Sequence, residues 1–427
     1  MNAMDTPAPV ASRKPAAARL SFYLKQPYHY LMALLSAILY GFPSRKLTVI
    51  AVTGTKGKSS VVELISALLD EAGYKTAHAS TIHFKIGEKK ERNLHKMTMP
   101  GRFFLQSFLR KAVRAGCDTA VIEMTSEGAR QFRHKFISLD GLIFTNLSPE
   151  HIESHGSYEN YVAAKVSLAH ALERSRKKNK MLVVNGDDKE APKFLAAFSG
   201  RKLTYGRADV KGEVITADGV SFNWEGVRIE SKLPGEFSLY NILAAITCAK
   251  AIGVPVESIR SGVAKIENIL GRAQKIEAGQ DFSVIVDYAH TPDSLEKFYQ
   301  TYAGKFRICV LGNTGGGRDT WKRPVMAQVA EKYCDHIILT NEDPYDENPE
   351  KIIREMAAGL TTKEATLILD RRAAIRTAIQ KASKGDVVLI TGKGTDPYIM
   401  GPRGSREPWS DADVAREEIT AHLSRVA

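Results

Sequence analysis

A chain of 427 residues is longer than one hydrophobic core usually supports, so we expect two or three domains. Its 44% hydrophobic and 25% charged residues are typical of globular proteins and exclude a disordered or fibrous chain. The net charge of +12 suits nucleic acid, anionic lipid or a phosphorylated substrate. Because the chain shows no zinc-ligand spacing, aromatic RNA-binding signature or heptad repeat, we expect no nucleic-acid partner.

The N-terminal residues differ in composition from the rest of the chain. Residues 1–20 are basic and rich in Ala and Pro, which predicts a flexible arm. Residues 26–44 contain no Asp, Glu, Lys or Arg, but their dense apolar part is too short to cross a bilayer comfortably. We predict a helix packed on the first domain. The alternatives are peripheral membrane contact through residues 26–44, flanked by Lys25, Arg45 and Lys46, and a true membrane span.

From residue 47 onward, strand-like and helix-like segments alternate. Short buried strands are predicted at residues 47–52, 121–124, 141–145 and 181–184, which is typical of a parallel sheet covered on both faces. Between residues 203 and 229 the pattern changes to short β segments and predicts a small antiparallel piece. Strands at residues 282–286, 307–311, 336–340 and 386–391 predict a second doubly wound α/β domain.

The four cysteines carry little information about function. Cys117, Cys248, Cys309 and Cys334 are scattered, and no two of them form a Cys-X-X-Cys pair. Such a pattern predicts buried free thiols in a reducing compartment, so we expect a cytoplasmic protein.

Residues 51–60, Ala-Val-Thr-Gly-Thr-Lys-Gly-Lys-Ser-Ser, join the first predicted strand to an amphipathic helix. Such a turn aims backbone N–H groups and the positive end of the helix dipole at one point, which suits a polyphosphate. Lys58 would reach the β- and γ-phosphates, and Ser59 would ligate Mg²⁺. Only two residues separate Gly54 from Gly57, fewer than in the general P-loop pattern, and an ordinary strand-to-helix turn is the alternative.

A second group of candidate residues is Glu123, near the end of a predicted strand, with His151 and Lys165. A carboxylate and an imidazole are reasonable partners for Mg²⁺, whereas an ammonium group is not a metal ligand. Lys165 would join them only if CO₂ converted it to an anionic carbamate. A core histidine and a solvated helix lysine are the alternatives.

Taken in order, these motifs resemble the Mur ligase family over roughly residues 46–427. The matching segments are residues 52–59, residues 145–151 with His155 and Gly156, and residues 161–165, 185–188, 233–237 with Asn241, 271–272 and 287–292. The likeness is greatest to the branch that adds the third residue of the peptidoglycan stem peptide, MurE. It implies an arm and apolar helix at residues 1–46, a central ATP-binding domain with a parallel sheet at 47–272, and a Rossmann-like α/β domain that binds the amino acid at 273–427.

The resemblance also implies a set of ligands. ATP and Mg²⁺ would bind the central domain, with Ser59, Glu123, His151 and a carbamylated Lys165 around the metal. Lys58, Lys165, His151 and Arg272 would be catalytic, with Arg272 near the γ-phosphate. The nucleotide contacts would be Gly54, Thr55, Lys56, Gly57, Lys58, Ser59, Asn241, Arg272, Asp287 and His290.

The reaction that the family performs is an ATP-dependent amide ligation. ATP first phosphorylates a carboxylate, because a free carboxylate is a poor acyl donor, and an amine then attacks the acyl phosphate. Mg²⁺, Lys58 and Arg272 would neutralise the charge that develops between two anions. The substrates implied are a UDP-linked muramyl peptide or a related acceptor, and an amino acid. These roles belong to peptidoglycan biosynthesis and thus to cell wall, cell shape and cell division.

By the same resemblance, the amino acid would bind segments of the C-terminal domain. The residues concerned are Arg318, Asp319, Glu342, Asp343, Tyr345, Gly392 and Asp396. Diaminopimelate-adding members carry an Asp-Asn-Pro-Arg motif whose arginine holds the distal carboxylate, and the aligned residues here are Glu342-Asp343-Pro344-Tyr345. We therefore expect a diamino acid with a distal amine, lysine or ornithine. A charged surface turn is the alternative.

Two features of the chain depart from the MurE pattern. Mur tripeptide synthetases usually begin with a domain that grips the UDP-sugar, and this chain has too few residues before Leu47 to build one. The Ser-Ser-His that follows the metal-binding glutamate of the family is replaced by Thr125-Ser126-Glu127, where Thr125 and Ser126 would contact substrate. The alternative functions are a folylpolyglutamate-synthase-like ligase and an ATP-binding, Mur-like subunit of an amidotransferase complex.

Overall fold

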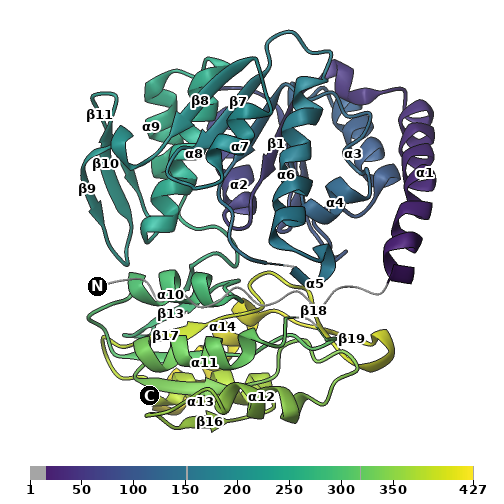
Figure 1. Cartoon of the computed structure of the whole chain (residues 1–427). Helices are drawn as coiled ribbons and strands as arrows, with labels where there is room; N and C mark the ends of the chain where they lie inside the picture. The colour runs from purple at the N-terminus through teal and green to yellow at the C-terminus, as the bar shows by residue number, and fades with distance from the viewer. Residues whose placement is uncertain (1–15, 151, 318, 427) are drawn as a thin grey trace.

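The computed structural model describes residues 16–150, 152–317 and 319–426. Figure 1 shows two α/β domains, one above the other, with the N-terminal helix α1 (Ala16–Leu39) along the outer side of the upper domain. The fold class predicted from the sequence, a parallel-sheet domain followed by a Rossmann-like domain, is confirmed.

Helix α1 packs on the first domain against α3, as predicted, and a short 3₁₀ turn, η1 (Pro43–Lys46), follows it. Its buried face consists of the small side chains Ala33, Ser36 and Ala37. The helix begins at Ala16, so residues 16–20, which we expected in a flexible arm, are helical, in keeping with the high helix propensity of Ala. The expected arm otherwise lies outside the described residues. Among the helices that the structure describes, none is long and apolar enough to span a membrane.

The upper, middle domain is built on an eight-stranded sheet with the order β4-β3-β2-β5-β1-β6-β7-β8. Strands β2, β5, β1, β6, β7 and β8 are parallel, and β3 and β4 extend the sheet as antiparallel strands. The strands are β1 (Thr48–Thr53), β2 (Thr76–Ala79), β3 (His83–Ile86), β4 (Lys89–Arg92), β5 (Thr119–Glu123), β6 (Gly141–Phe144), β7 (Met181–Asn185) and β8 (Arg201–Tyr205).

Helices cover both faces of this sheet, which explains why its central strands are apolar throughout. One face packs against α2 (Lys58–Glu71), α8 (Glu236–Ile252) and α9 (Val256–Lys265). The other face packs against α3 (Arg102–Arg114), α6 (Tyr158–Glu173) and α7 (Ala191–Ala196). The short helices α4 (Ser126–Arg130) and α5 (Ile152–His155) follow the carboxyl ends of β5 and β6.

The predicted antiparallel piece is a separate three-stranded sheet with the order β11-β10-β9. Its strands are β9 (Lys211–Ile215), β10 (Val220–Trp224) and β11 (Val227–Ser231), and the turn η2 (Arg207–Asp209) precedes them. Phe222 and Trp224 alternate with polar residues along β10 and join the core beside α8 and α9.

The lower, C-terminal domain has a six-stranded sheet with the order β12-β13-β17-β14-β15-β16, parallel except for β12. Helices α10, α11 and α12 cover one face, and α13 and α14 cover the other. The strands are β12 (Gln274–Ile276), β13 (Ser283–Val286), β14 (Arg307–Leu311), β15 (His336–Leu339), β16 (Ala365–Leu367), β17 (Val387–Ile390), and the separate pair β18 (Tyr398–Met400) and β19 (Arg406–Pro408). The helices are α10 (Pro292–Thr301), α11 (Lys322–Tyr333), α12 (Pro349–Ala357), α13 (Arg371–Lys381), η3 (Pro402–Gly404) and α14 (Asp411–Val426).

The expectation of four free thiols is wrong for two of the cysteines. Cys309 on β14 and Cys334 at the end of α11 form a disulfide, with their Cα atoms 6.0 Å apart. Cys117 and Cys248 are buried free thiols, as predicted. The pair was missed because 25 residues separate the two cysteines in the sequence, and only the return of the chain after α11 brings them together.

Candidate nucleotide and amino-acid site

The loop between β1 and α2 has a backbone that only glycine tolerates at two positions. Gly57 precedes α2 with a φ of 81°, and a Cβ atom there would lie 2.2 Å from Asn241 Oδ1. At Gly54, a Cβ atom would lie 1.9 Å from Thr145 Oγ1. The two glycines therefore let the loop backbone pack directly against Asn241 and Thr145. The N-terminus of α2 then faces the space between the domains.

Lys58, the first residue of α2, is held over the loop. Its ammonium group donates a hydrogen bond to the carbonyl oxygen of Thr55 at 2.9 Å and lies 3.8 Å from Glu123 Oε1. Burial lowers the pKa of Lys58, although the nearby carboxylate of Glu123 opposes this effect. A cation fixed at the start of a helix, where free N–H groups gather, suits a polyphosphate.

Ser59 and Glu123 form an oxygen cluster beneath the phosphate loop. The hydroxyl of Ser59 donates to Glu123 Oε2 at 2.9 Å, and the backbone N–H and hydroxyl of Thr81 reach the same oxygen at 2.8 and 3.0 Å. The guanidinium group of Arg272 lies 3.3 Å from Ser59 Oγ. A hydroxyl and a buried carboxylate are hard oxygen donors and fit Mg²⁺. The third predicted ligand, His151, lies outside the described residues.

Lys165 is buried, with 2% of its surface exposed, and donates a hydrogen bond to the carbonyl oxygen of Gly54 at 2.6 Å. Its ammonium nitrogen lies 5.0 Å from the centre of the Tyr161 ring. Burial and the neighbouring charge of Lys58 hold the pKa of Lys165 well below its usual range. The alternative of a solvated helix lysine is therefore wrong, and the site favours an uncharged amine at this position.

A cavity of about 380 Å³ lies between the two domains beside the phosphate loop. Asn241, Arg272 and Asp287 line it, together with Lys56 and Gly57, so five of the predicted nucleotide contacts lie around one space. The cavity is also lined by Asn146, Asn185, Asp187 and Phe237, which belong to the matching segments but had no predicted role, and by Tyr240 and Phe298, which lie outside those segments. A partly apolar cavity next to a phosphate loop has the size and chemistry for a nucleoside.

Arg272 and Asp287 are fixed in place by the chain around them. The Arg272 guanidinium lies 4.5 Å from the centre of the Tyr288 ring and donates to the carbonyl oxygen of Gly271 at 2.9 Å. Asp287 accepts hydrogen bonds from the backbone N–H groups of Ala273 and Ala289, and burial raises the pKa of its carboxyl. These contacts orient both side chains before any nucleotide binds.

His290 faces a carboxylate of the middle domain across the gap between the domains. Its Nε2 atom lies 3.0 Å from Glu150 Oε1, and Lys56 reaches the same oxygen at 3.1 Å. Burial, with the charge of Lys56, lowers the pKa of His290 to about 4, so the imidazole is neutral at pH 7. Glu150 directly precedes the predicted residue His151. No role was predicted for Glu150 itself, because in the sequence it is one residue of a Ser-Pro-Glu-His segment.

In the C-terminal domain, Asp343 and Asp396, two of the four acidic residues predicted to hold the amino acid, are paired with lysines of this chain. Asp343 accepts a hydrogen bond from Lys393 at 2.8 Å and another from Lys96, and the two lysines lower its pKa against the effect of burial. Asp396 lies 3.3 Å from Lys96 and 3.6 Å from Lys393. The alternative of a charged surface turn is wrong, because Asp343 and Asp396 are buried between the domains.

Glu342, like Asp319, keeps an oxygen without a hydrogen-bond partner among the described residues. Thr314 donates to its Oε1 atom at 2.8 Å, and the buried Oε2 atom has no partner. Burial and the nearby Asp343 raise the pKa of Glu342. Gly392 lies against this oxygen, and a Cβ atom there would be 2.5 Å from Glu342 Oε2. A side chain at this position would therefore collide with the carboxylate, so the loop requires glycine there.

The other predicted substrate residues lie on loops that border the two sites. Asp319 is buried, and its Oδ1 atom has no hydrogen-bond partner among the described residues. Thr125 caps α4 by accepting a hydrogen bond from the Gly128 N–H at 3.1 Å, and the hydroxyl of Ser126 lies 3.1 Å from His155 Nε2. Tyr345 adopts a positive φ of 52°, and its backbone N–H donates a hydrogen bond to the carbonyl oxygen of Met400. Arg318 lies outside the described residues.

Sequence reasoning missed three residues that shape the sites. Lys96 comes from a loop of the middle domain and carried no signal, because its partners lie 247 and 300 residues further along the chain. Thr81, which binds Glu123, also lies outside any motif. Lys393 stands inside the Gly392-Lys-Gly-Thr-Asp396 segment, so its place in a motif could have revealed it.

Known proteins resemble this chain over both of its domains. The Mur ligase middle domain family matches residues 52–249, and the family described as Mur ligase, glutamate ligase domain matches residues 271–394. A UDP-N-acetylmuramoyl-L-alanyl-D-glutamate--2,6-diaminopimelate ligase of Syntrophomonas wolfei is 40% identical over 86% of this chain and 78% of the relative. A UDP-N-acetylmuramyl-tripeptide synthetase of Roseiflexus sp. is 37% identical over 91% and 81%.

Solved structures show the same relationship. A UDP-N-acetylmuramoyl-L-alanyl-D-glutamate--2,6-diaminopimelate ligase superposes with a TM-score of 0.60 at 30% identity, over 88% of this chain and 79% of that one. A Mycobacterium tuberculosis folylpolyglutamate synthase complexed with ADP superposes with a TM-score of 0.71 at 17% identity, over 89% and 96%, which shows a shared fold. The extent and identity of these matches establish that the chain belongs to the Mur ligase family.

Proposed function

We propose that this chain is a MurE-type ligase that joins a diamino acid to a carboxylate of a UDP-linked muramyl peptide, with hydrolysis of ATP to ADP and phosphate. The observation that carries the proposal is the cluster beneath the phosphate loop, where Ser59 lies 2.9 Å from Glu123 and 3.3 Å from Arg272. Its members come from the first turn of α2, from the end of β5 and from the junction of the domains, so the cluster forms only in the assembled fold.

The chain's own groups suit phosphoryl transfer to a carboxylate. The loop from Gly54 to Ser59 would hold the phosphates, and Ser59 and Glu123 would hold Mg²⁺, which supplies charge neutralisation. Lys58 and Arg272 place two cations where the γ-phosphate and the acceptor carboxylate, both anions, must approach each other. The amine then attacks the acyl phosphate, and phosphate leaves.

Lys165 would act as a carbamate. Its uncharged nitrogen attacks the carbon of CO₂, an N–C bond forms, and one N–H proton is released to solvent. The product is an anionic oxygen donor in place of a cation, and it would lie beside Lys58 and the Mg²⁺ ligands. The lowered pKa of this buried amine supports the step, because only the neutral form of a lysine is a nucleophile.

The incoming amino acid would carry a distal amine. By the resemblance to the family, Tyr345 would stand where diaminopimelate-adding members have an arginine, so the guanidinium that binds a second carboxylate would be missing. Asp343 and Asp396 are already neutralised by Lys96 and Lys393, which leaves Glu342 with one free, buried oxygen to accept an ammonium hydrogen bond. We therefore favour lysine or ornithine over diaminopimelate.

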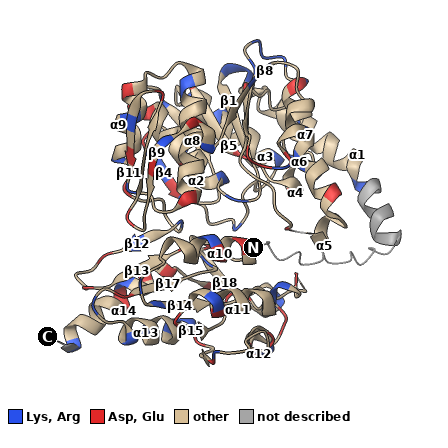
Figure 2. Ribbon diagram, turned by 60° about the vertical axis from the view of Figure 1, so that its left-hand side comes forward, with Lys and Arg blue, Asp and Glu red and all other residues tan. Residues whose placement is uncertain are grey.

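We further propose that the enzyme works in the cytoplasm and touches the membrane surface through α1. A stripe of α1 is exposed and apolar, and Leu31 and Leu39 expose 57% and 67% of their surface. In Figure 2, the part of this helix that is coloured by residue type is mostly tan, the colour of uncharged residues. The remaining exposed apolar residues of the stripe are Tyr28, Leu35 and Ile38, whereas the ring of Tyr30 packs against Phe132 and Phe136 of the middle domain.

Basic residues lie at the end of the same stripe. Arg110, Lys111 and Arg114 of α3 line a hollow together with Ile38 and Leu39, and Arg45 and Lys46 follow α1. Apolar side chains beside basic ones suit the interface of an anionic bilayer.

Sedimentation with vesicles that contain anionic lipid tests this contact. The expected result is binding that a Leu31→Glu, Leu39→Glu variant loses, and equal binding by that variant would contradict it.

Phosphate release is the test of the proposed ligase activity. The assay combines the protein, ATP and Mg²⁺ with UDP-muramyl dipeptide or a folate as acceptor, and with lysine, ornithine, diaminopimelate or glutamate as amine. We expect release only with the muramyl acceptor and a diamino acid. Release with the folate and glutamate would instead support a folylpolyglutamate-synthase-like ligase, whose fold this chain shares. No release with any pair would support an ATP-binding subunit without complete catalysis.

A further inference from the structure

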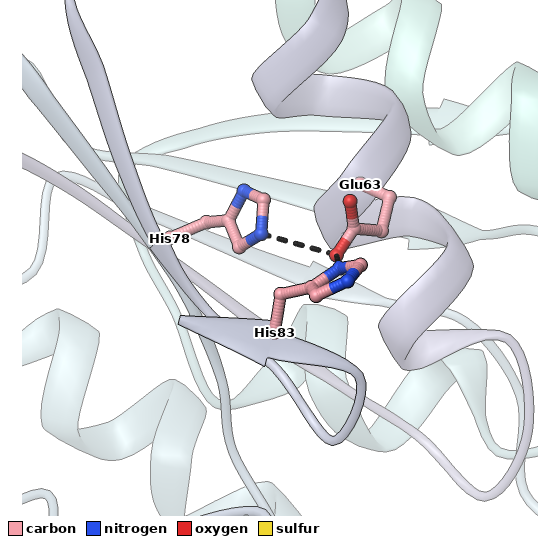
Figure 3. A group of neighbouring side chains, drawn as sticks. All are labelled: Glu63, His78 and His83. Carbon is pink, nitrogen blue, oxygen red and sulfur yellow. Dashed lines mark hydrogen bonds and ion pairs between the residues drawn. The ribbon is translucent and has the colours of Figure 1, made fainter. Parts of the chain in front are cut away.

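Two histidines and a glutamate meet one helical turn below the phosphate loop, outside the site described above. Glu63 lies on α2, four residues after Ser59, while His78 lies on β2 and His83 on β3. Figure 3 shows both imidazole rings directed at the carboxylate of Glu63. Three residues from a helix and two strands thus converge on one point, although no spacing in the sequence links them.

The separations of their ligand atoms fit a tetrahedral metal ion. Glu63 Oε1 lies 3.0 Å from His78 Nε2 and 3.4 Å from His83 Nδ1, and the three ligand atoms all lie within 4.8 Å of one another. Zinc binds such atoms at roughly 2.0 to 2.2 Å, which places neighbouring tetrahedral ligands roughly 3.3 to 3.6 Å apart. A shared ion therefore requires only small side-chain movements.

The burial of His78 points to a ligand as well. Only 1% of its surface is exposed, and neither ring nitrogen has a hydrogen-bond partner of acceptable geometry among the described residues, despite the approach of Glu63. A buried imidazole without such partners carries a desolvation cost that a metal ion would remove. The charge of the ion would also balance the carboxylate of Glu63, which lies 3.0 Å from His78 Nε2.

An open side of the cluster leaves room for a further ligand. Glu63, His78 and His83 line a cavity of about 360 Å³, whose other walls include Ser66, Asp70 and residues 265–270. Two imidazoles and one carboxylate with an open fourth position suit Zn²⁺, whereas Mg²⁺ prefers oxygen ligands alone. We propose that Glu63, His78 and His83 form a Zn²⁺ site, distinct from the Mg²⁺ site at Ser59 and Glu123.

The position of the ion gives it a structural role. The turn between His78 and His83 carries Ser80, whose hydroxyl lies 3.3 Å from Glu63 Oε1, and Thr81, which donates two hydrogen bonds to Glu123. A Zn²⁺ ion bound by a residue before this turn, one after it and one on α2 would fix the turn against the phosphate-loop helix. Through Thr81 it would hold Glu123 in the orientation that the Mg²⁺ site requires.

Zinc binding to the whole, chelator-stripped chain tests the proposal without any ligase assay. Competition with a coloured zinc indicator gives the affinity, and anomalous diffraction at the zinc edge locates the ion. The variants are His83→Gln, which removes a half-buried ligand, and Glu123→Gln, which removes the proposed Mg²⁺ ligand. His170→Gln, an exposed histidine on α6, is the matched control. Thermal unfolding without zinc checks that each variant folds.

We expect one tightly bound Zn²⁺ per chain in the wild type, His170→Gln and Glu123→Gln. His83→Gln should bind at least about a hundredfold more weakly, because even the loss of a residue that only supports a metal ligand costs roughly ten- to a hundredfold. Zinc should also slow amide hydrogen exchange at residues 80–83 in the wild type. No stoichiometric binding by the wild type, equal affinity in His83→Gln, or unchanged exchange on binding would overturn the proposal. Failure of the ligase assay alone would leave these results unaffected.

Discussion

Lys96 of the middle domain lies 3.3 Å from Asp396 of the C-terminal domain and joins the two halves of the molecule. The same ammonium group donates a hydrogen bond to Asp343, and these two carboxylates raise the pKa of Lys96 against the effect of burial. Arg92, four residues earlier, reaches the carbonyl oxygens of Thr395 and Trp409 at 3.3 and 3.4 Å. The segment around β4 thus fixes the position of the loop that would bind the amino acid.

Replacement of Lys96 by methionine should weaken the contact between the domains. A hydrogen bond between charged groups contributes roughly 1.5 to 3 kcal/mol, so we expect KM for the amino acid to rise about tenfold or more. Small-angle X-ray scattering should show a larger radius of gyration. Lys89→Met, at an exposed lysine on β4, is the control and should change neither quantity. A Lys96→Met enzyme with unchanged KM and dimensions would show that this contact does not hold the domains together.

Replacement of Glu123 by glutamine should impair Mg²⁺ use while the fold stays intact. Glutamine keeps the shape of the side chain but removes the charge, so the Mg²⁺ concentration for half-maximal rate should rise, and kcat should fall by about a hundredfold or more. Steady-state rates over a Mg²⁺ series measure both quantities, with Glu159→Gln on the exposed face of α6 as control. Lys58→Ala should abolish turnover. Near-normal phosphate release by the Lys58 or the Glu123 variant would refute the assignment of the phosphate loop.

Lys165 should take up CO₂. With ¹³C-labelled bicarbonate, the wild-type protein should give a carbamate signal in the NMR spectrum that Lys165→Ala lacks. The variant should be nearly inactive and partly rescued by formate or acetate, because a small carboxylate replaces the missing anion. Lys178→Ala, at an exposed lysine, serves as control. A plain lysine at position 165 in an active enzyme rules the carbamate out.

The amino-acid preference should depend on Tyr345 and Glu342. The wild type should prefer lysine or ornithine, and Tyr345→Arg should shift the preference toward diaminopimelate, since a guanidinium can bind a second carboxylate in two hydrogen bonds. Glu342→Gln should lose about one to two decades of selectivity for the distal amine. Competition assays measure the ratios of kcat/KM. A clear wild-type preference for diaminopimelate or glutamate would mean that the loop has another role.

The parts of the site that were predictable from the sequence are the ones that are local in the chain. Gly54, Gly57, Lys58 and Ser59 stand within six residues, so their turn geometry and chemistry could be inferred together. The alternation of apolar strands and helical segments likewise predicted both α/β domains.

The features that were missed depend on contacts between distant segments. The partners of Lys96 lie in another domain, and Glu63, His78 and His83 come from one helix and two strands. The short strands β3 and β4 consist largely of charged and partly exposed residues, so they lack the apolar pattern of a buried strand, although they extend the sheet and carry His83. Asp343 and Asp396 were predicted to be near the substrate, but their partner Lys96 comes from the middle domain and could not be inferred from the sequence.

The most direct test of the ligase proposal is the fate of an oxygen atom of the acceptor. UDP-muramyl dipeptide with oxygen-18 in the carboxylate to be extended is incubated with the enzyme, ATP, Mg²⁺ and lysine, and the phosphate released is analysed by mass spectrometry. Formation and breakdown of an acyl phosphate must transfer one labelled oxygen per amide bond from the carboxylate to phosphate. We predict that each product molecule is accompanied by one labelled phosphate. Amide formation with unlabelled phosphate, or labelled acceptor recovered without product, would contradict the proposed reaction.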